Sequence, residues 1–283
     1  MRRMLGELLI PLGIAYGAVL VLVFVFQSHL VYFPGTGREV VVTPQTYGLV
    51  FETVGIQTAD GETLQAWWVP AEGARGTVLF FHGNAGNISH RLDYLLMFNR
   101  LRYSTLIVDY RGYGRSSGTP SEDGTYRDGE AAWRHLTEIR KFAPRDIVLF
   151  GESLGGGVAT WLALQHPPRA LVLASTFTSA PDLGAQVYPW LPVRWLARIE
   201  YNNLERIPRI TAPVLIAHSK GDDIIPFSHG RALFDAAREP KQFLELRGGH
   251  NDGFIFAREE WVREVGAFLE RAEQRTQSPS TAR

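Results

Sequence analysis

Short runs of apolar residues alternate along the chain with longer segments of mixed polarity. From about residue 50 these runs predict eight strands, at 51–58, 63–69, 77–82, 104–109, 146–151, 170–175, 213–218 and 242–247. Helices are predicted between them, at about 89–102, 122–141, 154–166, 228–238 and 257–273. Most of the strand runs are apolar throughout, which is typical of strands covered on both faces. The alternation therefore predicts an α/β fold with an eight-stranded, mostly parallel sheet and helices on both of its faces.

One interval departs from this alternation. The strands that end at Ser175 and begin at Pro213 are separated by 37 residues rich in Tyr, Trp, Leu and Pro. A connection of this length is often functional, so we predict a lid-like insert at about 177–203 that begins near the catalytic edge of the sheet. The alternative is ordinary core beneath a crossover helix. With no internal repeat, residues 29–275 are predicted to form one domain, followed by a disordered tail at 276–283.

The N-terminal segment has a different pattern. Leu8 to Phe26 are nineteen residues without a charge, and as a helix they would be about 28 Å long, close to the hydrocarbon thickness of a bilayer. We predict a transmembrane anchor within residues 1–28. A cleaved signal peptide and a buried core helix are the alternatives, but no small-x-small cleavage site follows. Arg2 and Arg3 predict a cytoplasmic N-terminus and a catalytic domain outside the cytoplasm, on the periplasmic side of a bacterial inner membrane.

Composition narrows the classes of function. Basic and acidic residues balance at 29 each, so nothing in the charge indicates a nucleic-acid partner. The chain has no cysteine, which excludes disulfides, thiolate metal sites and a cysteine nucleophile. His82 raises the possibility of a metal site, but no His, Asp and Glu set has ligand spacing. We therefore expect neither a metal nor another cofactor.

Residues that could carry chemistry lie where four predicted strands end. Ligands of open parallel sheets bind at the carboxyl ends of the strands. One strand leads into Gly-Glu-Ser-Leu-Gly at 151–155, and the others lead into segments 82–87, 219–223 and 248–252. A serine, an acid and a histidine thus follow one another in this order at strand ends. This is the order expected when Gly-x-Ser-x-Gly forms a nucleophile elbow.

Each residue type has a chemical role in such a site. Ser153 becomes a nucleophile only when a base takes its proton, and His250 can do so near neutral pH. An acid in segment 219–223 would orient the imidazole and stabilise its charged form. The Gly-x-Ser-x-Gly motif alone, however, occurs by chance in roughly one chain in ten of this length. A turn without chemistry at Ser153 and an ordinary loop histidine at His250 are therefore the alternatives.

A developing oxyanion needs backbone N–H donors that are already in place. Two positions suit this role: Leu154, at the predicted helix start, and Asn84, in the glycine-rich loop after strand 77–82. Gly83, Gly151 and Gly155 would support them, because glycine lets neighbouring segments of backbone approach closely.

Several of these stretches together resemble the serine α/β-hydrolases. They are LVYFP at 30–34, FFHGNAGN at 80–87, DYRGYGRSSGTPSE at 109–122, GESLGGGVA at 151–159, PVLIAHSKGDDIIPFSHG at 213–230 and GGHND at 248–252. The likeness covers about residues 28–272. More narrowly, the chain resembles a membrane-anchored branch that includes acyl-protein thioesterase-like (depalmitoylase) proteins and bacterial relatives labelled as peptidases or uncharacterised hydrolases.

The resemblance implies a role for each matching residue. It makes Ser153 the nucleophile, Asp222 the acid and His250 the base, with oxyanion donors at Asn84 and Leu154. It also implies that the loop carrying Asp109, Arg111 and Tyr113 buttresses the oxyanion loop. Ser219 stands where the family usually has glycine, which bears on the turn of the acid and not on the chemistry.

The expectation is a membrane-anchored serine hydrolase that cleaves carboxylic ester or thioester bonds through an acyl-enzyme. Its substrate would be an acyl-containing small molecule, a lipid or a lipidated protein. A serine peptidase and a catalytically silent binding protein on the same fold are the alternatives. The first would need a recognition site for an amine terminus, which the sequence does not display. The second has no chemical reason to keep the serine, acid, histidine and glycine-rich loop together.

Overall fold

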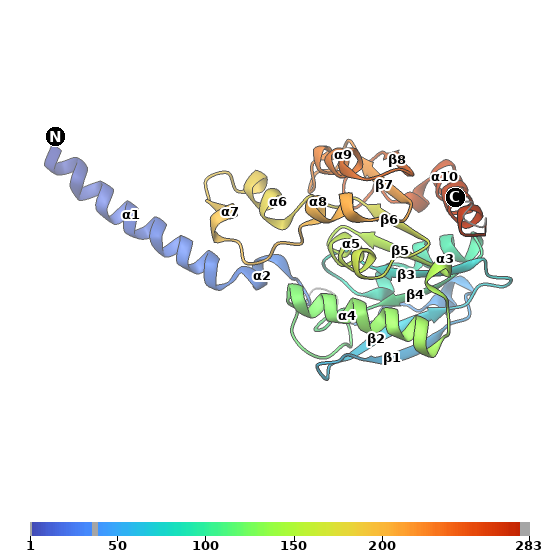
Figure 1. Cartoon of the computed structure of the whole chain (residues 1–283). Coiled ribbons are helices and arrows are strands. Elements are labelled where there is room, and N and C mark those ends of the chain that lie inside the picture. Colours follow the sequence, from blue (N-terminus) through green and yellow to red (C-terminus); the bar gives the residue numbers. More distant parts are fainter. Residues whose placement is uncertain (1, 36–38, 278–283) are drawn as a thin grey trace.

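A single sheet of eight strands organises the molecule. In a computed structural model, which describes residues 2–35 and 39–277, the strands lie in the order β1-β2-β4-β3-β5-β6-β7-β8 (Figure 1). Their bounds are β1 Glu52–Gln57, β2 Thr63–Val69, β3 Gly76–Phe81, β4 Tyr103–Val108, β5 Ile147–Glu152, β6 Ala170–Ala174, β7 Val214–Ser219 and β8 Lys241–Leu246. Strands β1 and β2 are antiparallel to their neighbours, and the other pairs are parallel. The predicted eight-stranded, mostly parallel sheet is confirmed.

Helices cover both faces of this sheet and extend beyond it. Their bounds are α1 Arg2–Val25, α2 Gln27–Val31, α3 Leu92–Arg100, α4 Glu122–Arg134, α5 Gly155–Gln165, α6 Ala180–Val187, α7 Val193–Leu196, α8 Asn203–Arg206, α9 Phe227–Ala236 and α10 Glu259–Gln277. A π-helical turn at His135–Ile139 continues α4, so the helix predicted to residue 141 changes geometry near its end. The predicted tail at 276–283 lies outside the described residues, apart from 276 and 277, which end α10.

The burial pattern of the strands follows from their place in the sheet. Every residue of β3, β4 and β5 is buried, because these central strands are covered on both faces. One apolar cluster packs α4, α5 and α9 against one face, and a second packs α3 and α10 against the other. Strand β1 lies at the edge and buries alternate residues, as a strand with one solvent-facing side should. The carboxyl ends of the parallel strands therefore meet at one edge of a rigid, two-sided core.

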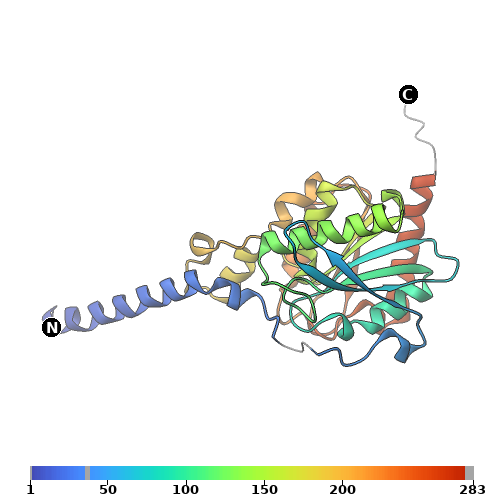
Figure 2. The same ribbon diagram turned by 90° about the horizontal axis from the view of Figure 1, so that it is seen from below.

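The N-terminal helix α1 projects away from the domain, as both views show (Figures 1 and 2). Its apolar side chains are largely exposed, among them Leu9, Ile10, Leu12, Ile14, Val21 and Leu22. The transmembrane anchor predicted over residues 8–26 finds no support here: among the described residues, no helix has both the length and the apolarity to cross a bilayer.

The interval between β6 and β7 contains the short helices α6, α7 and α8. Its aromatic residues divide into two groups. Phe177 and Tyr201 are buried in the apolar core, whereas Trp190 is 58% exposed and Trp195 is 92% exposed. The two ends of this interval therefore belong to the core, as the alternative interpretation expects, whereas its middle is largely exposed. We refer to residues 187–198 as the exposed arm.

Candidate active site

Ser153 occupies a sharp turn between β5 and α5. Its φ of +51° lies in the left-handed region, which side chains other than glycine rarely adopt. Two hydrogen bonds of its main chain hold it there: the Ser153 N–H donates to Ala174 O at 2.9 Å, and Thr176 Oγ1 donates to Ser153 O at 2.7 Å. A strained residue persists only when its surroundings over-determine its position, and such residues cluster at active sites. Ser153 is thus presented at the strand edge by a turn built for one side chain.

The glycines that flank Ser153 make this turn possible. A Cβ on Gly155 would stand 2.1 Å from Phe81 O, and one on Gly151 would stand 2.6 Å from Gly155 O. Real Cβ atoms do not approach carbonyl oxygens so closely, so only glycine lets α5 begin directly against β3 and β5. Gly83 lies at the same junction, where an added Cβ would be 3.3 Å from Ser153 Cβ. The loop after β3 therefore passes immediately beside the serine.

The ends of β5, β7 and β8 bring Ser153, Asp222 and His250 into one hydrogen-bonded chain. His250 Nε2 lies 3.2 Å from Ser153 Oγ, and His250 Nδ1 lies 2.8 and 3.0 Å from the two carboxylate oxygens of Asp222. The order of nucleophile, base and orienting acid is the one required to move a proton off the serine hydroxyl. Residues 97 and 28 positions apart in sequence are thus placed within direct reach.

Asp222 is buried, with no side-chain surface exposed. Burial by itself raises the pKa of the carboxyl, but hydrogen bonds from His218 and His250 and from the Ile225 N–H outweigh it and hold the pKa well below its usual range. The Ile225 N–H donates at 2.7 Å, and His218 Nε2 lies 3.4 Å from the carboxylate. Asp222 therefore remains an acceptor beside the imidazole. His218 was not singled out from the sequence, where it is simply the last residue of the predicted strand 213–218.

Asp223 serves a different partner. Its Oδ1 accepts the backbone N–H of His250 at 2.7 Å, so it secures the histidine loop and does not face the imidazole. Two neighbouring acids therefore hold the same residue, one through its ring and the other through its main chain.

The loop after β3 passes beside the start of α5: a Cβ on Gly83 would stand 3.3 Å from Ser153 Cβ. Asn84 follows Gly83 in this loop, and Leu154 follows Ser153. Among the described residues, neither the Asn84 N–H nor the Leu154 N–H donates a hydrogen bond. Because the loop borders Ser153, both groups are at hand for an oxygen atom on a substrate held at the serine. The two predicted oxyanion donors therefore directly follow two residues that lie against each other, Gly83 and Ser153.

A buried histidine, His82, contacts the loop after β3 from the core side. His82 Nδ1 lies 2.7 Å from Gly83 O, and since a carbonyl can only accept, Nδ1 carries the proton. The Gly83 carbonyl and the Asn84 N–H belong to one peptide plane, so this bond fixes the direction in which the N–H points. On its other side, His82 Nε2 lies 3.3 Å from Asp109 Oδ1 and, within the described residues, makes no hydrogen bond. The structural partner of His82 is therefore the Gly83 carbonyl. Among the described residues, no group of three or more His, Asp or Glu side chains could hold a metal ion.

The variable residue of the serine motif also contributes. Glu152 Oε2 accepts from Arg91 Nε at 2.7 Å and from the Gly83 N–H at 3.4 Å. The pair joins the start of α3 to the turn of the nucleophile. Sequence reasoning could not have found it, because the two residues are 61 positions apart and neither belongs to a recognisable spacing.

The matches to known proteins agree with this geometry. A family model described as alpha/beta hydrolase fold matches residues 76–206. The alpha/beta hydrolase domain-containing protein WAV2 of Arabidopsis thaliana is 33% identical over an alignment that covers 96% of each chain. The chain belongs to the alpha/beta hydrolase fold family.

Other family members resemble this chain over most of their length. An uncharacterised protein of Mycobacterium tuberculosis is 41% identical, across 83% of this chain and 84% of its own. The human alpha/beta hydrolase domain-containing protein 17B is 34% identical, across 77% and 72%. Among solved structures, an esterase of Pyrococcus furiosus superposes with a TM-score of 0.68 at 21% identity, over 82% of this chain and 94% of that one. The last likeness concerns the fold.

Proposed function

We propose that this protein is a serine hydrolase that cleaves carboxylic ester or thioester bonds through an acyl-enzyme. The observation that carries the proposal is the hydrogen-bonded chain from Ser153 Oγ through His250 to the buried Asp222 carboxylate, with the serine on a strained turn. Family membership and the esterases among the superposed structures support the same class of reaction.

The steps follow from the positions of these groups. Ser153 Oγ attacks the acyl carbonyl carbon while His250 Nε2 takes the hydroxyl proton, and Asp222 stabilises the imidazolium. The oxygen of the tetrahedral intermediate accepts from the N–H groups of Asn84 and Leu154. Collapse breaks the bond to the alcohol or thiol, which leaves with the proton from His250. A water molecule, activated in turn by His250, then attacks the acyl-enzyme and releases the acid, regenerating Ser153.

The test is labelling and turnover of the purified full-length chain. Wild type should react with a fluorophosphonate probe and hydrolyse p-nitrophenyl esters, whereas Ser153→Ala should fold normally, take no label and lose on the order of 10⁴-fold in turnover. Matched thioester and amide substrates identify the bond that is cleaved. Faster cleavage of the amide would replace the proposal with a peptidase, and an unlabelled, inactive wild type would indicate a binding protein.

We infer in addition that α1 and the exposed arm contact a lipid surface. The arm is joined to both N-terminal helices: Tyr16 Oη of α1 donates to Trp190 O at 2.8 Å, and Gln27 Nε2 of α2 donates to Leu196 O at 2.7 Å. The Arg198 guanidinium lies 4.7 Å from the Phe24 ring centre. Apolar side chains of α1 and Trp and Tyr side chains of the arm are exposed side by side, and aromatic residues favour the interface between lipid and water. Association of this kind needs no crossing helix.

A further inference from the structure

The side chain of Asn84 is used separately from its backbone. Its Nδ2 donates to Val31 O at 2.6 Å. Its Oδ1 accepts from Tyr113 Oη at 2.6 Å and from the Phe33 N–H at 3.2 Å. Burial raises the pKa of Tyr113, so its hydroxyl stays protonated and remains a donor. The amide therefore clasps the chain segment 31–33, which comprises the last residue of α2 and the two residues after it, more than fifty residues before Asn84 in sequence.

Segment 31–33 is itself held firmly. Tyr32 between the two clasped backbone groups is 3% exposed, and its hydroxyl lies 2.9 Å from Tyr201 Oη. Tyr201 Oη lies 2.8 Å from Thr125 Oγ1 in α4, and a Cβ on Gly157 of α5 would stand 2.4 Å from the Tyr201 ring. A chain of buried hydroxyl groups thus fixes Tyr32 against the helices that follow the nucleophile and the β4 loop.

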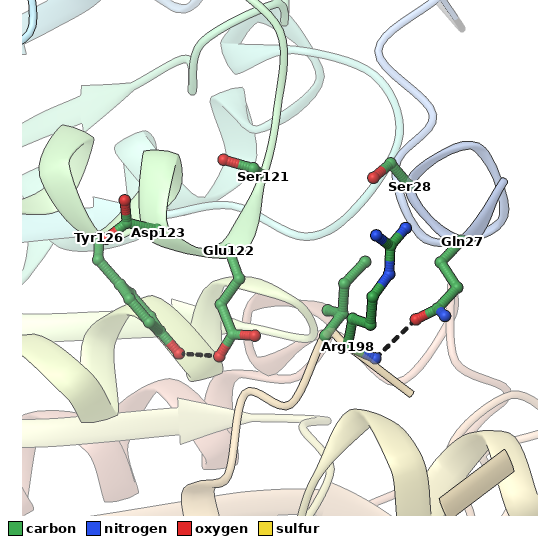
Figure 3. A pocket seen from close by; sticks show the side chains of 8 residues that line it. Gln27, Ser28, Ser121, Glu122, Asp123, Tyr126 and Arg198 are labelled. Atoms are coloured by element: carbon green, nitrogen blue, oxygen red, sulfur yellow. Dashed lines mark hydrogen bonds between the residues drawn. The ribbon is translucent and has the colours of Figure 1, made fainter. Parts of the chain in front are cut away.

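These contacts give the N-terminal segment a role in the site. If the function proposed above is correct, the Asn84 N–H must point at the oxyanion. The precision of its direction depends on the contacts that hold the loop in place. His82 fixes one end of the Gly83–Asn84 peptide unit from within the core. The Asn84 carboxamide fixes the other end from outside. A cavity of about 430 Å³ lies between α2, the start of α4 and residues 198–199 (Figure 3).

We propose that Asn84 is a positioning residue whose side chain, gripped by segment 31–33 and Tyr113, holds its own backbone N–H in the oxyanion hole. The segment that joins the N-terminal helices to the domain is then part of the catalytic apparatus. Losing the clasp lowers stabilisation of the transition state while substrate binding is retained, because only the developing oxyanion needs the N–H.

The decisive variant is Asn84→Ala in the full-length chain, since alanine keeps the backbone N–H and removes the carboxamide, which holds segment 31–33 and also accepts the Ala85 N–H at 3.0 Å. We expect kcat to fall by about 10- to 100-fold with KM changed less than about twofold. The inhibition constant of an aryl trifluoromethyl ketone, which forms a tetrahedral adduct with the serine, should weaken by the same factor. Asn99→Ala is the matched control: its Nδ2 also donates to a backbone carbonyl, Pro70 O at 3.0 Å, but on α3 away from the serine. It should leave kcat unchanged.

Tyr113→Phe removes one donor to the clasp without a change of shape, and keeps the test open if Asn84→Ala folds poorly. It should lower kcat by a smaller factor, and the double variant should be no slower than Asn84→Ala, because both changes remove the same support. Three results would overturn the proposal. They are an unchanged kcat in Asn84→Ala, a KM that rises by as large a factor as kcat falls, or a fall in kcat of the double variant that equals the product of the two single falls. Failure of the hydrolase function itself would instead appear as an inactive, unlabelled wild type.

Discussion

At the scale of single residues, the neighbouring acids Asp222 and Asp223 differ sharply in what they can do. Both lie in the turn after β7 and both hold His250. Only Asp222 reaches the imidazole, and only Asp222 is buried among further donors. A one-position difference in sequence therefore separates an acid that can stabilise charge on the ring from one that secures the loop.

Replacing each aspartate with asparagine tests these two roles separately. Asp222→Asn should lower kcat by on the order of 10⁴-fold, because a neutral amide neither stabilises the imidazolium nor keeps the tautomer. Asp223→Asn should lose less than about tenfold, since the amide oxygen still accepts the His250 N–H. Steady-state kinetics of both variants on one ester checks this, and equal losses would contradict the assignment of the acid.

The lowered pKa of Asp222 also predicts how the stability of the folded protein depends on pH. Its pKa in the folded protein is held below that of the unfolded chain, about 3.9, so the unfolded state binds more protons in acid. The contribution of Asp222 is therefore complete above about pH 4 and is lost as the pH falls below it. In urea titrations, the difference in unfolding free energy between wild type and Asp222→Asn should shrink as the pH is lowered from 7 to 3. A difference that stays constant would show that the carboxylate is not stabilised by its donors.

At the scale of elements, the loop after β4 is held by α4 through a buried ion pair. Arg111 Nε donates to Asp128 Oδ1 at 2.9 Å, and the Arg111 N–H donates to Asp128 Oδ2 at 2.9 Å. The Arg111 guanidinium also reaches the hairpin residue Asp60 at 2.8 Å. This loop carries Tyr113 to Asn84. The order of the oxyanion loop thus depends on an ion pair that takes no part in the chemistry.

Removing one partner of this pair should be costly. Asp128→Ala leaves the buried Arg111 with one partner fewer, which we expect to lower the unfolding free energy by about 3 to 5 kcal/mol. Asp60 is partly exposed, so Asp60→Ala should lower it by about 1 kcal/mol or less. Urea unfolding followed by tryptophan fluorescence measures both. Equal losses would mean that the pair with α4 is not the main anchor of the loop.

At the scale of the whole molecule, the two apolar features outside the core lie on the same side. Helix α1 projects from the domain, and the exposed arm packs against its end near α2 (Figures 1 and 2). The interval that contains the arm starts beside the nucleophile, where Thr176 bonds to Ser153 O. A lipid surface in contact with α1 would therefore also meet the arm.

Vesicle flotation tests this arrangement. The full-length protein should float with phospholipid vesicles, and Trp190→Ala combined with Trp195→Ala should weaken partitioning by about tenfold, since each aromatic ring loses apolar area buried in lipid. Ile139→Ala is the control, because Ile139 is also exposed but lies after α4, away from the arm. Wild type that stays with the soluble fraction, or a control that weakens binding equally, would contradict the inference. Activity on p-nitrophenyl acetate, octanoate and dodecanoate then indicates whether longer acyl chains are preferred.

Much of this molecule could be read from local patterns. Continuous apolar runs predicted the strands to within a residue or two, because burial on both faces leaves no polar position in a central strand. Asp60-Gly61, between the first two strands, is a pair typical of hairpin turns, and β1 and β2 are antiparallel there with Gly61 at a φ of +91°. The serine, acid and histidine could be proposed together because parallel strands bring their carboxyl ends to one edge.

What the sequence by itself determined, then, is every feature that depends on near neighbours: the strands, the turns, and the strand ends at which chemistry could lie. Tertiary structure alone decided which distant groups meet. The Asn84 clasp on segment 31–33, the Arg91–Glu152 pair and His218 behind Asp222 join residues with no regular spacing or no motif. The physical reason is that backbone geometry and periodic burial are local properties, whereas the partner of a polar side chain is set by the packing of the whole fold around it.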